Sequence, residues 1–288
     1  MLTHEFLAKK KPTRIVILGA GGFIGQVLVR QLTNLKVEVL PLTSSAVDLL
    51  DEYATQNLID LFDSNDCVVM LAALTPDRGR DITTYQKNIT MAENVCEALR
   101  QKPVAHVVYM SSDAVYSMRT ARISEQTLAA PDDLYGLMHR TRELMFQQAS
   151  SAPVVVLRST MVAGRGDTHN SYGPNRFHRQ AVQQGCISLG GEGEETRDHI
   201  FSEDVAALTT LAILHRSSGV LNLATGRSCS FYEVAKMVAE RTDQVVEIKT
   251  SERGMPVTHR SFDTTATNAA FPGFTFVSLP EMLDKSFG

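Results

Sequence analysis

The fold of this chain is decided by seven residues near its N-terminus, Gly19-Ala20-Gly21-Gly22-Phe23-Ile24-Gly25. They follow an apolar run, residues 14–18, that is typical of a buried strand, and they open an apolar-periodic segment, residues 23–32, that predicts a helix. Glycines allow a tight turn and a close approach of the backbone to a ligand, and the unpaired N–H groups of a helix N-terminus face phosphates. A strand, a glycine turn and a helix in this order favour a nucleotide site over a turn that binds nothing.

The bulk composition describes an ordinary soluble globular protein, with 288 residues, 43% hydrophobic and 21% charged. A net charge of −4 gives no electrostatic reason to expect nucleic acid or an anionic membrane as a partner. No apolar run approaches the roughly 20 residues of a membrane span, and the N-terminal residues lack the apolar core of a signal peptide. The four cysteines are scattered along the chain without the spacing of metal ligands, so we expect no metal site: Cys67, Cys96, Cys186 and Cys229. Free cysteines of this kind fit a reducing compartment, and we expect a cytoplasmic protein.

Strand-like and helix-like segments alternate over the first two thirds of the chain. Predicted strands cover residues 36–40, 66–73, 104–110 and 153–158, and predicted helices cover residues 84–100 and 133–149. This pattern predicts an α/β fold, a Rossmann-like doubly wound parallel sheet with ligands at the carboxyl ends of its strands.

The pattern changes after Arg158. A polar stretch, residues 163–174, reads as a long loop, followed by predicted helices at 203–215 and 231–241 and predicted strands at 220–223 and 245–249. We expect residues 1–162 to form the dinucleotide-binding core. Residues 163–288 are expected to return strands to that core and to form a small C-terminal α/β lobe for the substrate.

Three further motifs accompany the glycine turn. They are Ser111-Ser112-Asp113-Ala114-Val115-Tyr116 at the end of a strand, Tyr135-Gly136-Leu137-Met138-His139 in a helix, and Asn88 in an earlier helix. Shorter matches occur at residues 71–73, 157–158, 193–205 and 221–226. The ordered set resembles the extended short-chain dehydrogenase/reductase family, specifically its nucleotide-sugar epimerases, dehydratases and ketoreductases, nearly from end to end.

The resemblance implies a catalytic set. Tyr135 would be the acid/base that moves a proton on or off a sugar oxygen during hydride transfer, and Ser112 the hydroxyl that shares this oxygen. Asn88 would hold the helix geometry or a water relay. Considered alone, Tyr135 is also compatible with a packed helix tyrosine and Ser112 with a loop serine.

The chain departs from the family at position 139, where His139 stands in place of a lysine. The four-residue spacing still puts His139 on the helix face of Tyr135, whereas Arg140 points roughly 100° away. A neutral imidazole supplies no positive charge to lower the pKa of a phenol. Either His139 is held protonated, or the positive charge of the cofactor suffices, or the chain is inactive; on the first two accounts, His139→Lys preserves or raises turnover.

Asp113 follows the active-site serine at a position where relatives often carry a second acid. It would protonate a substrate carbon or hydroxyl, or it caps a turn just past the strand. Sugar dehydratases usually place Glu after this Asp, and Ala114 stands there instead, which weakens a dehydratase reading.

The dinucleotide is expected to be NAD or NADP, with a lean toward NADP. No acidic residue follows the second strand to bind the ribose hydroxyls, and Thr43 or Ser44 would donate hydrogen bonds to a 2′-phosphate. Asp48-Leu49 resembles the pair that flanks the adenine, although Asp48 is also compatible with a helix N-cap. The expected cofactor-binding residues are Gly19, Gly22, Phe23, Ile24, Gly25, Thr43, Ser44, Asp48, Leu49, Leu71, Ala72, Ala73, Tyr135 and His139.

The expected substrate is a nucleotide sugar. Arg197 matches the position that clamps the diphosphate in relatives, where a guanidinium binds bidentately. Further candidates lie in polar loops, where an ordinary solvated role is equally compatible: Arg78, Arg80, His169, Asn170, Asn175 and Arg176.

The sequence therefore predicts an NAD(P)-dependent nucleotide-sugar epimerase or 4-ketoreductase. Two alternatives stay open, a catalytically silent NAD(P)-binding sensor or interaction protein and a reductase of a small non-nucleotide carbonyl compound. The resemblance also implies a homodimer joined through the helices predicted at 84–100 and 133–149.

Overall fold

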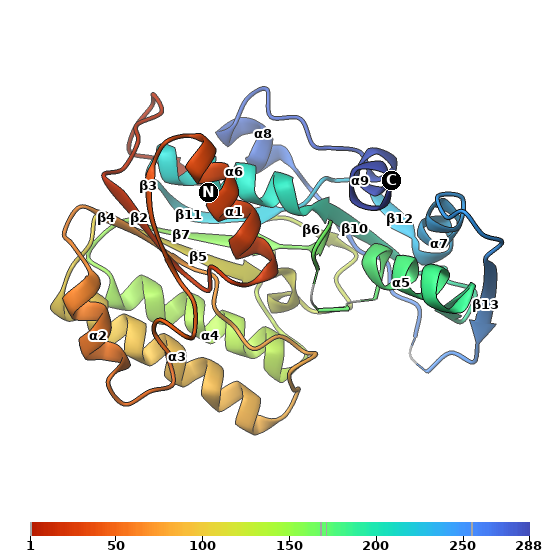
Figure 1. The fold of residues 1–288 in the computed structure, drawn as a ribbon, viewed down its shortest axis with the longest axis horizontal. Coiled ribbons are helices and arrows are strands. Elements are labelled where there is room, and N and C mark those ends of the chain that lie inside the picture. Colours follow the sequence, from red (N-terminus) through yellow and green to blue (C-terminus); the bar gives the residue numbers. More distant parts are fainter. Residues whose placement is uncertain (1, 168, 171, 255) are drawn as a thin grey trace.

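A computed structural model describes residues 2–167, 169–170, 172–254 and 256–288. A seven-stranded sheet forms its centre, and all neighbouring strands are parallel except for an antiparallel strand at one edge (Figure 1). In spatial order the strands are β1 (Thr3–His4), β11 (Ser217–Leu223), β7 (Val154–Ser159), β5 (His106–Ser112), β4 (Asp66–Met70), β2 (Arg14–Leu18) and β3 (Glu38–Leu42). The predicted α/β fold with a doubly wound parallel sheet is confirmed.

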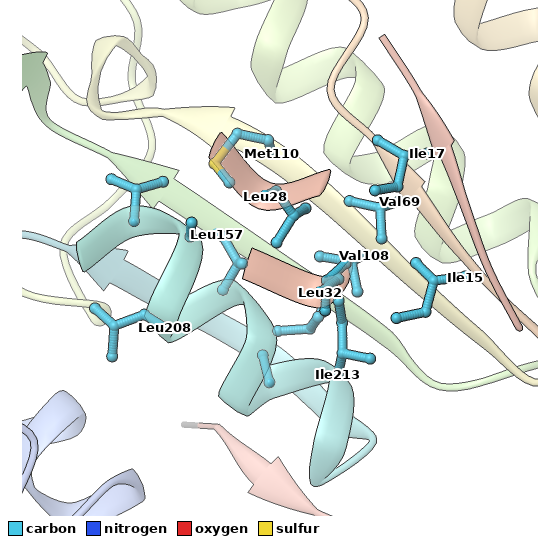
Figure 2. Packing of buried hydrophobic residues seen from close by; sticks show 14 of the residues in the cluster. Ile15, Ile17, Leu28, Leu32, Val69, Val108, Met110, Leu157, Leu208 and Ile213 are labelled. Carbon is cyan, nitrogen blue, oxygen red and sulfur yellow. The ribbon is translucent and has the colours of Figure 1, made fainter. Parts of the chain in front are cut away.

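Helices cover both faces of this sheet, as Figure 1 shows. One face carries α1 (Phe23–Asn34), α6 (Ser202–Leu214) and α8 (Thr265–Ala270), and the other carries α2 (Ala54–Leu61), α3 (Ile82–Gln101) and α4 (Leu134–Ala149). Successive side chains of a strand point to opposite faces. Ile15 and Ile17 therefore pack with α1 and α6, a cluster drawn in Figure 2, while Val16 and Leu18 pack with α2 and α3.

The remaining elements form smaller sheets and a third hydrophobic cluster beside the large sheet. The strands are β8 (Met161–Ala163) with β10 (Thr196–Phe201) and β12 (Ser228–Ser230), β9 (Cys186–Gly190) with β13 (Glu247–Ser251), and β6 (Arg122–Ile123) with β14 (Ser261–Phe262). The helices are α5 (Pro174–Gln184), α7 (Phe231–Ala239), α9 (Leu279–Phe287) and the 3₁₀ turn η1 (Asp113–Val115). The division of the chain after residue 162 stays a prediction.

Element boundaries differ from the sequence expectation where the backbone makes a special turn. The strand expected at 36–40 is β3, which begins and ends two residues later. Lys36 has a φ of 54°, a left-handed conformation that cannot belong to a strand. Pro41 lies inside β3, and an edge strand tolerates it because one side of the strand needs no hydrogen-bond donor.

Side-chain caps begin the two long helices that flank the site. The Asp81 carboxylate accepts a hydrogen bond from Thr84 N at 2.7 Å before α3, and Asp133 accepts one from Gly136 N at 2.8 Å before α4. By contrast, α1 has Gly22 as its N-cap and no side-chain cap, so among the described residues no side chain caps the N–H groups of its first turn. Within the described ranges, no helix combines the length and apolar content needed to cross a membrane.

Candidate active site

A cavity of about 670 Å³, here the larger cavity, lies at the carboxyl ends of β2, β3, β4, β5 and β7. The glycine turn forms one wall, and the ends of the central strands form the floor. Its lining includes all fourteen residues that the sequence assigns to the dinucleotide, from Gly19 to His139. Their placement around one cavity supports the assignment, and dinucleotide binding by each of them stays a prediction.

The glycine turn has the shape that a pyrophosphate site requires. Gly19 has a φ of 92°, and a Cβ there would lie 2.7 Å from Ala72 N. A Cβ on Gly25 would lie 2.3 Å from Gly19 O, closer than any real contact. Because side chains are excluded at both positions and the α1 N-terminus is uncapped, the backbone fits a dinucleotide pyrophosphate.

A second cavity of about 290 Å³, here the smaller cavity, adjoins the larger one. The two share a set of lining residues that form the boundary between them: Phe23, Ile24, Thr75, Ser112, Tyr135, Ser159 and His169. The smaller cavity continues toward Asp113, Thr160 and His199. The predicted acid/base and its hydroxyl partner therefore stand where a dinucleotide and a second ligand would meet.

Tyr135 is the second residue of α4, and burial raises the pKa of its phenol to about 12. The Asp113 carboxylate raises it as well, while the Ser112 hydroxyl and the Arg142 guanidinium lower it. The Ser112 oxygen also accepts a hydrogen bond from Ala114 N at 3.2 Å, which orients it at the end of β5. In the free site the phenol is thus protonated and can donate, but it needs positive charge to act as a base.

The surroundings of His139 do not favour that charge. Its ring is 3% exposed, its Nδ1 lies 2.7 Å from the Tyr109 hydroxyl, and burial lowers its pKa to about 3. Burial therefore favours the neutral imidazole over the protonated form, and which of the three accounts of position 139 applies stays a prediction. Its ring packs edge-on against Tyr135 with centroids 4.7 Å apart, and its Nε2 has no hydrogen-bond partner among the described residues.

Asn88 shapes the wall of the larger cavity without lining it. Its Oδ1 accepts a hydrogen bond from Leu74 N at 2.8 Å, and its Nδ2 donates to Leu74 O at 3.0 Å and to Thr84 O at 3.2 Å. This buried amide holds the loop that follows β4 against α3. The contacts support the first of the two roles expected for Asn88, to hold local geometry.

Asp113 lines the smaller cavity and faces an arginine from the C-terminal region. Its Oδ2 lies 3.3 Å from Arg260 Nη1, and Arg260 Nη2 donates to the backbone oxygen of Asp113 at 2.9 Å. Burial raises the pKa of Asp113, and the Arg260 charge opposes that shift. Asp113 therefore borders the space where a second ligand would lie, and its role as a second acid stays a prediction.

The predicted substrate residues separate into three groups. His169 and Asn175 line the smaller cavity, although the Asn175 amide is engaged with Gly164 O at 2.6 Å. Arg78 lines the larger cavity instead. The cavity linings do not include Arg80, Asn170, Arg176 or Arg197.

Arg197 is half-buried and already has partners. Its guanidinium donates to Thr258 O at 2.7 Å and to Thr258 Oγ1 at 2.6 Å. The Asn170 side chain accepts a hydrogen bond from Arg179, and Arg176 lies over the Tyr172 ring. A diphosphate clamp at Arg197 would have to replace the Thr258 contacts, and this role stays a prediction.

Two buried side chains beside the cavities were missed by sequence reasoning. His199 lines the smaller cavity, is 5% exposed, and has no hydrogen-bond partner on either ring nitrogen among the described residues. Arg142 lies behind the larger cavity and is fully buried. Arg142 is seven residues from Tyr135, which places both on one helix face, so helical spacing was a signal for it. No comparable signal marks His199, which lies in β10 among four consecutive buried residues.

The family model described as "NAD dependent epimerase/dehydratase family" matches residues 15–224. The chain belongs to this family, and the resemblance to extended short-chain dehydrogenases/reductases is confirmed. It is 26% identical over 270 residues to YtcB of Bacillus subtilis (strain 168), described as an uncharacterized UDP-glucose epimerase; the match covers 88% of this chain and 81% of that protein.

Two solved structures share the fold over nearly the whole chain. MoeE5 in complex with UDP-glucuronic acid and NAD is 25% identical, with a TM-score of 0.81, and the match covers 95% of this chain and 97% of MoeE5. RMD from Pseudomonas aeruginosa, complexed with NADPH, is 21% identical, with a TM-score of 0.82 and coverage of 96% and 97%. At that identity RMD shows similarity of fold alone.

Proposed function

We propose that this protein is an NAD(P)-dependent epimerase or 4-ketoreductase that acts at a sugar carbon of a UDP-sugar. One observation carries the proposal: Ser112 and Tyr135 line both cavities and so stand at their shared boundary. A nicotinamide ring in the larger cavity and a sugar in the smaller cavity would meet at these two side chains. The UDP-sugar is favoured because MoeE5 binds UDP-glucuronic acid and the Bacillus relative is described as a UDP-glucose epimerase.

The residues divide the chemistry between them. A bound nicotinamide dinucleotide would accept a hydride from the sugar carbon or return one to it. Tyr135 would take the proton from the sugar oxygen or give it back, and the Ser112 hydroxyl would hold that oxygen in place. Asp113 and His199 would contact the hydroxyls of the sugar, because both side chains line the smaller cavity.

The lean toward NADP is part of the proposal. Thr43 and Ser44 line the larger cavity after β3 and offer hydroxyl donors to a 2′-phosphate. The Asp48 carboxylate lines the same cavity and would repel a 2′-phosphate placed beside it. Fluorescence titrations with NADPH and NADH decide this point, and tighter binding of NADH would overturn the lean.

The first test measures what stays bound and what is made. Native mass spectrometry of freshly purified protein reveals any retained dinucleotide, and a panel of UDP-sugars is then incubated with and without added cofactor. Retained cofactor, together with an epimeric product formed without added cofactor, identifies an epimerase. An empty protein that reduces a UDP-4-keto-sugar, added to the panel as hydride acceptor, only with NADPH or NADH identifies a ketoreductase.

Replacing Tyr135 tests the role of its phenol. We predict that Tyr135→Phe lowers turnover by about 100-fold or more while dinucleotide binding persists, because only the proton-transferring oxygen is lost. Tyr53→Phe is a matched control, since Tyr53 is 64% exposed and lines neither cavity. Equal turnover in wild type and Tyr135→Phe would contradict the mechanism. Dinucleotide binding without product from any UDP-sugar would favour a silent binding protein or a reductase of small carbonyl compounds.

A further inference from the structure

The Tyr135 site needs a positive charge, and the described residues that surround it limit where that charge comes from. The carboxylates of Asp113 and Asp133 both raise the pKa of the Tyr135 phenol. Burial favours the neutral form of His139, the nearest basic side chain on α4. Arg260 is already 3.3 Å from the Asp113 carboxylate. Among the described residues, the Arg142 guanidinium lowers the pKa of the Tyr135 phenol and so opposes the two carboxylates.

Arg142 is unusual because it is a fully buried arginine whose polar contacts within the described ranges are neutral acceptors. Its Nη2 donates to Ala72 O at 2.8 Å, and its Nη1 lies 3.4 Å from Asn88 Oδ1 and 3.8 Å from Met138 Sδ. Its Nε has no partner among the described residues. A buried charge that no carboxylate compensates is costly, and departures of this kind are expected at functional sites.

The position of Arg142 joins it to the proposed active site by two routes. Ala72, whose carbonyl it binds, lines the larger cavity. Its guanidinium also lies 5.2 Å from the centre of the Tyr109 ring, and the Tyr109 hydroxyl is 2.7 Å from His139 Nδ1. His139 in turn packs against Tyr135. Along α4, Tyr135, His139 and Arg142 follow one another on a single face.

We infer that Arg142 is a positioning residue that supplies the positive charge for proton transfer at Tyr135, acting from behind the cavity wall formed by Ala72, Tyr109 and His139. The inference rests on the proposed function, since it assigns a role within the same site. It explains how the site tolerates a neutral His139. Arg142 lies one helical turn beyond His139 on α4 and lines neither cavity, so its charge would act without contact with substrate or cofactor.

The test compares variants that remove, keep or move the charge. Arg142→Met removes the positive charge. Arg142→Lys keeps the charge but loses the planar contacts to Ala72 and Asn88. The double variant His139→Lys/Arg142→Met moves the charge one turn along α4. Arg140→Met is the matched control, because Arg140 lies on the same helix but pairs with Glu143 at 3.0 Å. Each protein is loaded with dinucleotide.

The first readout is the pH dependence of turnover. In Arg142→Met we expect the pKa of Tyr135 during turnover to rise. Turnover at pH 7 then falls by about tenfold for each pH unit of that rise, because less of the basic form is present. Arg142→Lys and the double variant return the profile toward that of wild type. A purely structural role predicts instead that Arg142→Lys is as damaged as Arg142→Met and that the double variant rescues nothing.

The second readout does not require any turnover and so separates this inference from the proposed function. Protein carrying ¹³Cζ-tyrosine is titrated by NMR up to pH 11, and the Tyr135 signal is assigned by its loss in Tyr135→Phe. We expect the ionised fraction of Tyr135 at pH 11 to fall at least threefold in Arg142→Met and to be unchanged in Arg140→Met. An unchanged Tyr135 titration in folded Arg142→Met would overturn the inference, even if UDP-sugars are never turned over.

Discussion

Gly25 shows at the scale of one residue how the backbone prepares a binding site. It lies in the first turn of α1, where a side chain would fill the space between the helix and the carbonyl of Gly19. Gly22, at the N-cap, is less constrained, because a Cβ there would lie 3.3 Å from the same oxygen. The turn therefore depends more on Gly25 than on its neighbour.

We predict that Gly25→Ala weakens dinucleotide binding by at least tenfold, because the glycine turn must open to accept the methyl group. Titration of NADH and NADPH by fluorescence measures the affinity, and circular dichroism monitors folding. Gly190→Ala serves as the control, since a Cβ at that position meets nothing within 4 Å. Affinities that match in the two variants would show that the turn does not bind the pyrophosphate.

The residues that sequence reasoning could identify are those whose chemistry shows in local order. The glycine turn, Ser112 and Tyr135 stand in recognisable motifs, and all three line the larger cavity. His199 and Arg142 stand in no such motif: helical spacing places Arg142 on the face of Tyr135, but the burial without ordinary partners that marks both residues does not show in local order. Burial of a polar side chain is created by tertiary packing, which a single sequence does not display.

Helices α3 and α4 illustrate the scale of the element. Each has a buried face against the sheet, but α4 also leaves two apolar side chains in water, Leu137 at 43% and Leu144 at 47% exposure. They are seven residues apart and lie on one face. Ile82 at the start of α3 is 65% exposed. Such a surface fits the homodimer that the family resemblance implies.

We predict a dimer in solution that Leu144→Glu converts to a monomer, because a charge in the centre of an apolar interface must be desolvated without a partner. Size-exclusion chromatography with light scattering at micromolar concentrations measures the mass. Leu128→Glu provides the comparison, since Leu128 is 80% exposed and lies outside both helices. A wild-type monomer, or dimers in both variants, would remove these helices from consideration as the interface.

Helices could be predicted from the sequence where apolar residues recur at helical spacing over many residues. The helices predicted at 84–100 and 133–149 correspond to α3 and α4 within two residues at either end. By contrast, α5 was missed because its buried apolar stripe consists of Phe177 and Ala181 beside the N-terminal Pro174, while Val182 is exposed and the other residues are polar. Tertiary contacts with α7, not local pattern, stabilise that helix.

For the whole molecule, buried titratable groups set opposing responses to acid. Burial lowers the pKa of His106 to about 4 and raises the pKa of Asp204 to about 6. In the unfolded chain these groups titrate near 6.5 and 3.9. The stability that His106 contributes is present above pH 6.5 and is lost as pH falls toward 4. The stability that Asp204 contributes is present below pH 4 and is lost as pH rises toward 6.

We therefore predict that two single replacements change acid sensitivity in opposite directions. Between pH 7 and pH 5, the free energy of unfolding falls by about 2 kcal/mol less in His106→Gln than in wild type. The reason is that residue 106 no longer takes up a proton on unfolding. Over the same range, the free energy of unfolding falls by about 1 kcal/mol more in Asp204→Asn than in wild type, because the variant lacks the carboxyl group whose protonation favours the folded state. Urea unfolding at the two pH values measures both. Parallel shifts of the same sign would contradict the burial of one of the groups.

The short strand β1 has a consequence for how the molecule is made. It pairs at the sheet edge with β11, so that Thr3 lies opposite Ser218. During synthesis β1 leaves the ribosome before β11, so it must wait, unpaired, for a partner more than 200 residues behind it. The five strands that surround the larger cavity are complete once residue 159 has emerged, well before that partner. A nascent chain released at that point would present β7 as an open edge, a template for aggregation that β11 and then β1 later cover.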